Sequence, residues 1–134
     1  MMQALLQQHL GKSFVVESAG VWRKAAGAPA NSRSVMVMQE RGLDLTPHIG
    51  RWVGDIRLTD YSHIVCVDEQ AAADVRALLP SQADTTIVVA NADGGGIPDP
   101  YELGLEGYRA CLALLDAVMP NVASEIAGPP AARS

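Results

Sequence analysis

The stretch that decides the fold is Ile64-Val65-Cys66-Val67, an uninterrupted apolar run rich in β-branched residues. A second such run, Thr85-Thr86-Ile87-Val88-Val89, lies further along the chain. The segment between them, from Glu69 to Leu79, has helical spacing and ends at Pro80, with its inward positions expected at Ala72, Val75, Leu78 and Leu79. Continuous apolar strands joined by a helix are typical of parallel strands covered on both faces. The pattern predicts a doubly wound α/β fold.

The segments on either side extend this three-layer sandwich. Residues 13–18 are a strand candidate, and residues 4–10 form a short helix that ends at Gly11. A second helix is capped by Asn31 or Ser32 and ends at Gly42, and a long helix near the C-terminus carries an apolar face that Pro120 kinks or ends. Only three strands are visible, where about five is usual, so a strand of the small parallel sheet is missing or borrowed.

Length and composition favour one domain over residues 1–127, followed by a disordered tail at 128–134. Formal net charge is −5, which argues against nucleic acid as a partner. No apolar run approaches the roughly 20 residues of a membrane helix, so no membrane partner is expected. Cys66 and Cys111 are far apart with apolar neighbours, which indicates reduced, buried thiols in a cytoplasmic protein. No metal-ligand spacing occurs, and no metal or cofactor is expected.

Several short segments occur in one characteristic order. They are Glu17-Ser18-Ala19-Gly20, Trp22, Gly27-Ala28-Pro29-Ala30, the stretch from Arg41 to His48 with Arg51, the stretch from Asp60 to Glu69, and Pro98-Asp99-Pro100-Tyr101 before the terminal helix. Together they make the chain, up to about Met119, resemble the low molecular weight protein tyrosine phosphatases, a family that also includes arsenate reductases. The resemblance implies a flavodoxin-like fold and a phosphotyrosine protein or a small phosphate anion as partner.

The resemblance also implies roles for particular residues. Asp99 matches the general acid that protonates the leaving phenolate, and the flanking prolines stiffen its loop, although Asp-Pro turns are common without any such role. Trp22 and Tyr101 match aromatic walls for a planar substrate; the alternative is partial burial in loops. Ser18 and His48 match residues that support the phosphate loop through hydrogen bonds. In this chain either they pair with each other and with water, or they have no remaining role.

The chain departs from the family at its start. The family begins with a strand and a phosphate loop, in which a cysteine, five further residues and an arginine precede Ser-Pro and the first helix. Met1 to Leu6 resembles that helix, so a strand and loop of about twenty residues are expected to be absent. Because Cys66 and Cys111 are expected in the core, neither replaces the nucleophile. We therefore expect the chain as written to be an inactive phosphatase relative.

Loss of that strand would leave unpaired backbone groups on both sides of a gap, each costing on the order of 1–3 kcal/mol. Either the sheet closes directly, or a second copy fills the edge and makes a homodimer, which size-exclusion mass would test, or the written sequence starts at the wrong methionine. Two other functions stay open. One is a non-catalytic phosphate or phosphopeptide binding module; the other, arsenate reduction, is disfavoured because it needs more redox cysteines than the chain has.

Overall fold

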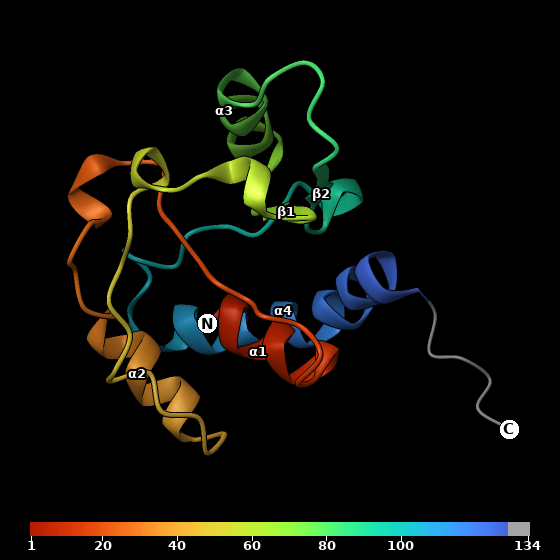
Figure 1. Ribbon diagram of the computed structural model, residues 1–134. Helices are drawn as coiled ribbons and strands as arrows, with labels where there is room; N and C mark the ends of the chain where they lie inside the picture. The colour runs from red at the N-terminus through yellow and green to blue at the C-terminus, as the bar shows by residue number, and fades with distance from the viewer. Residues whose placement is uncertain (129–134) are drawn as a thin grey trace, which may run out of the picture.

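The computed structural model describes residues 1–128. In chain order its elements are α1 (Met2–Leu10), α2 (Ser32–Gln39), β1 (His63–Cys66), α3 (Glu69–Leu78), β2 (Thr86–Val89) and α4 (Gly104–Ala127) (Figure 1). Short 3₁₀ turns lie at Arg23–Ala25, Val53–Asp55, Leu58–Asp60 and Ala92–Gly94. The expected disordered tail from residue 128 lies outside the described residues except for Gly128.

A small parallel sheet lies between two helical layers. β1 pairs with β2 in parallel, with His63 opposite Thr86 and Cys66 opposite Val89. Val65 and Val88 pack into the larger core with α1, α2 and α4, whereas the other face of the sheet packs on α3. Figure 1 shows α3 on one side of the strands and α1 with α4 on the other. The predicted three-layer α/β architecture is therefore confirmed.

Local signals in the sequence set the helix ends. The Asn31 side chain accepts a hydrogen bond from the Arg33 N–H, and the Asp68 side chain accepts one from the Ala71 N–H, so both residues are N-caps. α1 ends at Gly11, whose φ of +78° is a conformation that glycine adopts at little cost. These boundaries lie close to those predicted from the sequence.

The expectation that Pro120 could end the last helix is wrong. α4 continues through Pro120 to Ala127. Proline removes one helical N–H, but the buried residues Met119, Val122 and Ala123 hold both sides of this position in the core. Core packing of the flanking turns therefore outweighs the loss of one hydrogen bond.

α4 also contradicts the expectation that no segment is long and apolar enough to span a membrane. Among the described residues it is the one helix long and apolar enough to cross a bilayer by length and composition. Its most apolar window is 39% buried inside the protein, and core helices of soluble proteins pass the same test. Because α4 packs against α1 and α2, its apolar face has a partner within the chain.

The predicted strand at residues 13–18 is not observed. Residues 12–14 form a turn and a bend, residues 15–19 have no regular secondary structure, and the sheet of the described chain consists of β1 and β2. The expectation that the sheet closes directly is therefore wrong as well, since residues 14–18 do not pair with β1. A second copy at the open edge of β1 stays a prediction.

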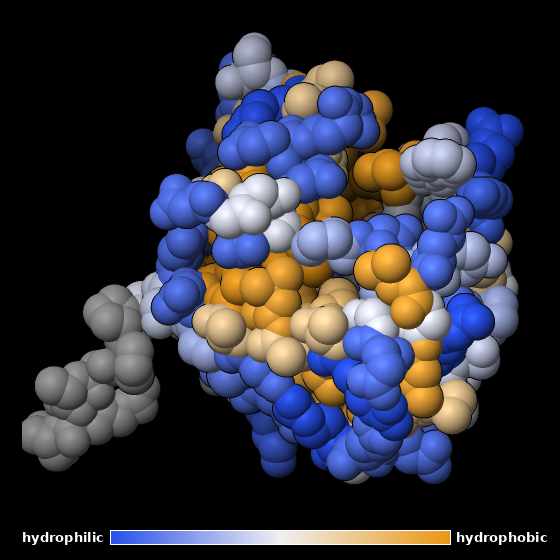
Figure 2. Space-filling view, turned by 180° about the vertical axis from the view of Figure 1, so that it is seen from behind, coloured by the Kyte–Doolittle hydropathy of each residue, from blue (hydrophilic) through white to orange (hydrophobic). Residues whose placement is uncertain are grey.

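Apolar side chains also reach the surface. Leu78, expected to face inward, is 56% exposed, because the buried stripe of α3 runs through Ala72 and Val75 to the half-buried Leu79 and leaves Leu78 beside it. Figure 2 shows an apolar area in the middle of the face opposite to the view of Figure 1, bordered by hydrophilic residues. Part of the apolar side-chain surface is therefore accessible to solvent on this face.

Candidate functional site

The residues assigned to the site from the sequence lie in two separate places. Asp99 and Tyr101 line an open pocket of about 360 Å³ together with Glu102 and Leu103. Ser18 and His48 line a smaller polar pocket of about 90 Å³, whose other lining residues are Gln3, Glu17, Ile49 and Arg51. Trp22 belongs to neither set. The structure therefore joins the sequence-predicted residues in two pairs and leaves the fifth apart.

Asp99 is held at the surface by its own loop. The Tyr101 N–H donates a 3.0 Å hydrogen bond to Asp99 Oδ1, which closes a tight turn around Pro100. The start of the loop is anchored just after the end of β1, because the Ile97 N–H donates to the Val67 carbonyl at 2.7 Å. Gly96 permits this approach: a Cβ on it would lie 2.5 Å from the Val67 carbonyl oxygen. The carboxylate of Asp99 is thus exposed on an anchored loop.

The two aromatic residues are both exposed but sit on different loops. Tyr101 is 62% exposed beside Asp99, and Trp22 is 65% exposed at the start of the Arg23–Ala25 turn. The Lys24 ammonium lies 4.7 Å from the centroid of the Trp22 ring. Tyr101 is therefore placed to border the Asp99 pocket, whereas the wall role of Trp22 stays a prediction.

Ser18 and His48 do not form the hydrogen bond with each other that was one expectation. The Ser18 hydroxyl donates to Gln3 Oε1 at 2.5 Å. The backbone N–H of His48 donates to the Leu45 carbonyl at 3.0 Å, and its side chain lines the small pocket. The Ser18 hydroxyl bonds to Gln3 and not to His48 because the segment that carries Ser18 runs alongside α1.

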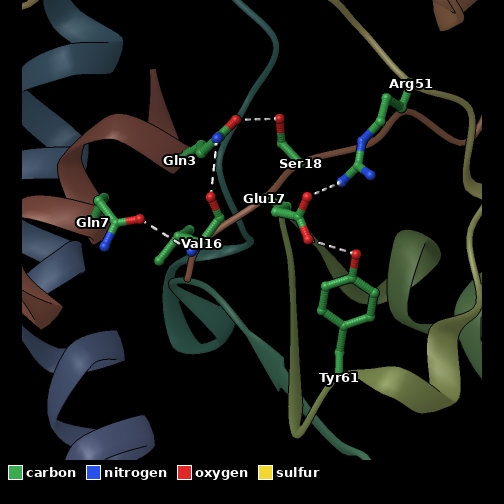
Figure 3. A network of polar contacts seen from close by, with 7 residues as sticks. All are labelled: Gln3, Gln7, Val16, Glu17, Ser18, Arg51 and Tyr61. Carbon is green, nitrogen blue, oxygen red and sulfur yellow. Dashed lines mark hydrogen bonds and ion pairs between the residues drawn. The ribbon is translucent and has the colours of Figure 1, made fainter. Parts of the chain in front are cut away.

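Two glutamines on α1 explain the conformation of residues 14–18 (Figure 3). Gln3 Nε2 donates to the Val16 carbonyl at 3.0 Å, and Gln7 Oε1 accepts from the Val16 N–H at 3.0 Å. Gln7 Nε2 also donates to the Phe14 carbonyl at 2.7 Å. Side-chain amides thus satisfy backbone groups that a neighbouring strand would otherwise bind. Sequence reasoning missed both glutamines, although their i,i+4 spacing places them on one helix face.

Arg51 is engaged with a carboxylate at the same pocket. Its guanidinium lies 3.3 Å from Glu17 Oε2, and the Tyr61 hydroxyl donates to Glu17 Oε1 at 2.8 Å (Figure 3). Both partners of the ion pair are about 40% exposed. The charge of Arg51 is therefore balanced within the chain, and Tyr61 links the segment of residues 14–18 to the start of β1.

Both thiols are free and buried, as expected from the sequence. Burial raises the pKa of the Cys66 thiol, which packs on Ala72 and Val75 of α3. Burial also raises the pKa of the Cys111 thiol, which lies 4.0 Å from the Pro98 carbonyl oxygen under the Asp99 loop. Neither group favours the thiolate form, which is the nucleophilic one. Within residues 1–128 no cluster of three acidic, histidine or cysteine side chains is arranged to hold a metal ion.

The chain and its fold match one protein family. The family model described as "Low molecular weight phosphotyrosine protein phosphatase" matches residues 1–129. The chain therefore belongs to the low molecular weight protein tyrosine phosphatase family, and the resemblance predicted from the sequence is confirmed.

Individual relatives agree with this assignment. The chain is 25% identical over 126 residues to "Probable low molecular weight protein-tyrosine-phosphatase EpsP" of Ralstonia nicotianae, which covers 91% of this chain and 86% of that protein. It is 28% identical over 118 residues to the low molecular weight protein-tyrosine-phosphatase of Streptomyces coelicolor, covering 81% and 70%.

Solved structures show the same fold. Vibrio vulnificus Wzb, solved in complex with benzylphosphonate, superposes with a TM-score of 0.80 at 22% identity over 92% of this chain and 87% of that chain. The protein tyrosine phosphatase of Entamoeba histolytica gives a TM-score of 0.75 at 21% identity, covering 94% and 85%.

Proposed function

We propose that this chain is a phosphatase-family domain that retains the general acid of a phosphotyrosine site but does not hydrolyse aryl phosphates. In the mechanism that the family resemblance implies, a thiolate attacks phosphorus and a carboxylic acid protonates the leaving phenolate. The chain offers an exposed carboxylic acid, Asp99, to which the resemblance assigns the role of general acid, and no thiol in a nucleophilic environment. That asymmetry is the basis of the proposal.

The state of the thiols carries the argument. Cys66 and Cys111 are buried, and burial raises the pKa of both. Neither is followed, after five further residues, by an arginine: Ala72 and Ala117 occupy those positions. A phosphate-binding loop needs backbone N–H groups and an arginine around the thiolate, and neither cysteine has this setting.

Asp99 supports the other half of the proposal. Its carboxylate is exposed, is oriented by the Tyr101 N–H, and lines an open pocket with the Tyr101 side chain. A planar aryl group can stack against a tyrosine ring while its ester oxygen faces the carboxyl group. The benzylphosphonate in the Wzb complex, in which a methylene takes the place of the ester oxygen, is a phenyl ligand bound to a protein of the same fold.

Hydrolysis of para-nitrophenyl phosphate tests the proposal. We expect no turnover above buffer from the chain, and no difference between the chain and Asp99→Asn. Asp93→Asn is the matched control, because Asp93 is also an exposed aspartate preceding the same loop. Turnover that Asp99→Asn abolishes and Asp93→Asn preserves would contradict the proposal.

A second candidate function is reversible binding of a phosphate group without chemistry. The residues that line the two pockets, Tyr101, Ser18 and His48, support it, whereas Trp22 lines neither pocket and is a candidate aromatic wall only through the family resemblance. Titration with phosphate or vanadate, followed by tryptophan fluorescence, tests this function. A saturable change supports binding, and no response across millimolar ligand removes the candidate. A cytoplasmic location is part of the same proposal, supported by the packing of α4 against α1 and α2.

A further inference from the structure

Two loops form a rigid unit at one end of the molecule. The Gly20 N–H donates to the Arg51 carbonyl at 2.8 Å, and the Val53 N–H donates to the Gly20 carbonyl at 2.8 Å. The Gly27 N–H donates to the Gly50 carbonyl at 2.8 Å, and the Gly50 N–H returns to the Ala28 carbonyl at 2.6 Å. We call residues 20–28 together with 50–55 the two-loop platform. In Figure 1 its orange and yellow turns lie side by side, away from the C-terminus.

The platform is closely packed at its centre. A Cβ on Gly50 would lie 2.3 Å from the Ala25 carbonyl oxygen, and a Cβ on Gly20 would lie 2.6 Å from the Ala25 Cβ. Contacts this short admit only glycine at the two positions. The loops therefore present their side chains from a fixed backbone.

Those side chains are two indoles and two cations. The Arg23 guanidinium lies 4.7 Å from the centroid of the Trp52 ring, and the Lys24 ammonium lies 4.7 Å from that of Trp22. Such cation–π contacts hold a charge over a ring without neutralising it. Because each cation already lies over a ring, these side chains lose less conformational entropy when a ligand binds them.

Neither cation has a carboxylate partner among the described residues. The other platform arginine, Arg51, is paired with Glu17, so it contributes little free charge. The platform carries one carboxylate of its own, Asp55, which is exposed and makes no ion pair with Arg23 or Lys24 within residues 1–128. In a chain with a net charge of −5, adjacent uncompensated cations are a local exception.

From this arrangement we propose that the two-loop platform is a docking surface for an acidic peptide segment. Carboxylates of the peptide pair with Arg23 and Lys24, and the exposed Trp22 ring packs against an apolar or aromatic side chain between them. A nucleic acid fits less well, because its charge density would be repelled by the net negative protein. None of the platform residues lines the Asp99 pocket.

Tryptophan fluorescence gives a direct test, because Trp22 and Trp52 are the two tryptophans of the chain and both belong to the platform. The probe is a short oligo-glutamate peptide containing one leucine, titrated at low ionic strength. We expect a saturable change in emission. The apparent Kd should rise as salt is added, since salt screens exposed charges beyond a Debye length of about 10 Å at 0.1 M.

Charge-reversal variants distinguish binding to the platform cations from attraction by the charge of the whole protein. Arg23→Glu with Lys24→Glu should weaken peptide binding at least about tenfold. Lys12→Glu with Arg76→Glu changes the net charge by the same amount at exposed positions outside the platform, and should leave the Kd within about twofold, since distant exposed charges are screened. Both variants replace exposed side chains, and circular dichroism checks that they fold.

Equal weakening by the two double variants would overturn the proposal, as would tighter binding of oligothymidylate than of the oligo-glutamate peptide. Absence of any fluorescence response to the peptide would also overturn it. None of these results bears on the proposed phosphate site. A response to phosphate or vanadate in the Arg23→Glu, Lys24→Glu variant, without one to the peptide, would show the two sites to be separate.

Discussion

The Gln7 side chain holds Val16 as a neighbouring β-strand would: its carbonyl oxygen accepts the Val16 N–H at 3.0 Å while its amide nitrogen donates to the preceding stretch. The segment of residues 14–18 is thereby fixed to α1 instead of to β1. This contact explains how the chain accommodates a sheet of two strands without leaving the Val16 backbone unsatisfied. Its loss has a direct energetic consequence.

Gln7→Leu should lower the free energy of unfolding by about 1–2 kcal/mol, because it leaves the partly buried Val16 N–H and Phe14 carbonyl without a partner. Urea denaturation measures the change. Gln8→Leu is the matched control, since Gln8 is the exposed neighbour on the same helix, and should cost less than about 0.5 kcal/mol. Equal effects would show that the glutamine contacts do not stabilise the fold.

Leu115→Ala should destabilise the chain by about 2–5 kcal/mol, because this side chain is 1% exposed in the core that joins α1, α2 and α4. Leu78→Ala removes the same atoms from a side chain that is 56% exposed, and should change stability by no more than about 0.5 kcal/mol. Thermal or urea unfolding of the two variants, each compared with the unmodified chain, measures both changes in stability. A large loss with Leu78→Ala would place that residue in the core, as its sequence pattern suggested.

The ion pair between Arg41 and Asp116 ties the end of α2 to α4 and gives a pH-dependent contribution to stability. The hydrogen bond from Arg41 holds the pKa of Asp116 below its ordinary value. A lowered native pKa means that the stabilisation is complete above the unfolded pKa of about 4 and disappears as the pH falls through the native pKa. Because both side chains are more than a third exposed, the contribution is at most about 1 kcal/mol.

Asp116→Asn should therefore reduce the free energy of unfolding at about pH 7, and its difference from the unmodified chain should shrink as the pH falls through the native pKa of Asp116. Urea unfolding across this range measures the difference. Asp93→Asn, at an exposed aspartate without an ion pair in the described chain, should show no such convergence. A destabilisation that persists at low pH would exclude the charge interaction as its cause.

The two thiols should react slowly with a disulfide reagent in the native protein at about pH 8, because burial both blocks access and raises the pKa of Cys66 and Cys111. In urea both should react at the rate of a free cysteine. The absorbance of the released reagent, followed over time with and without urea, measures the two reaction rates. A native thiol that reacts as fast as in urea would contradict the assignment of both cysteines to the core.

The sequence predicts most of the elements because their signals are local. Asn31 and Gly11 mark helix ends through their own backbone preferences, and the β-branched runs at β1 and β2 need only each other to pair. Residues 13–18 have the same composition as a strand, but strand formation requires a backbone partner at the neighbouring edge. In this chain that partner is two amide side chains, which no propensity scale describes.

The site is predicted less completely than the fold for a related reason. Asp99 and Tyr101 are two residues apart, so one turn brings them together. Ser18 and His48 come from loops that are distant in sequence, and their expected contact depends on which neighbouring side chain lies within hydrogen-bond distance of the serine. Gln3 does so from α1. Contacts between segments far apart in sequence are set by packing, and a single sequence carries little information about them.

The central proposal is that the chain presents a phosphatase scaffold without a reactive nucleophile. Mass spectrometry of the intact protein, denatured rapidly in alkali after incubation with an aryl phosphate, tests it most directly, because the P–S bond of a phosphocysteine is more stable in alkali than in acid and the adduct would appear as a mass increase of one phosphoryl group. We predict unmodified protein at every incubation time. A phosphoryl adduct mapped to Cys66 or Cys111 would contradict the account.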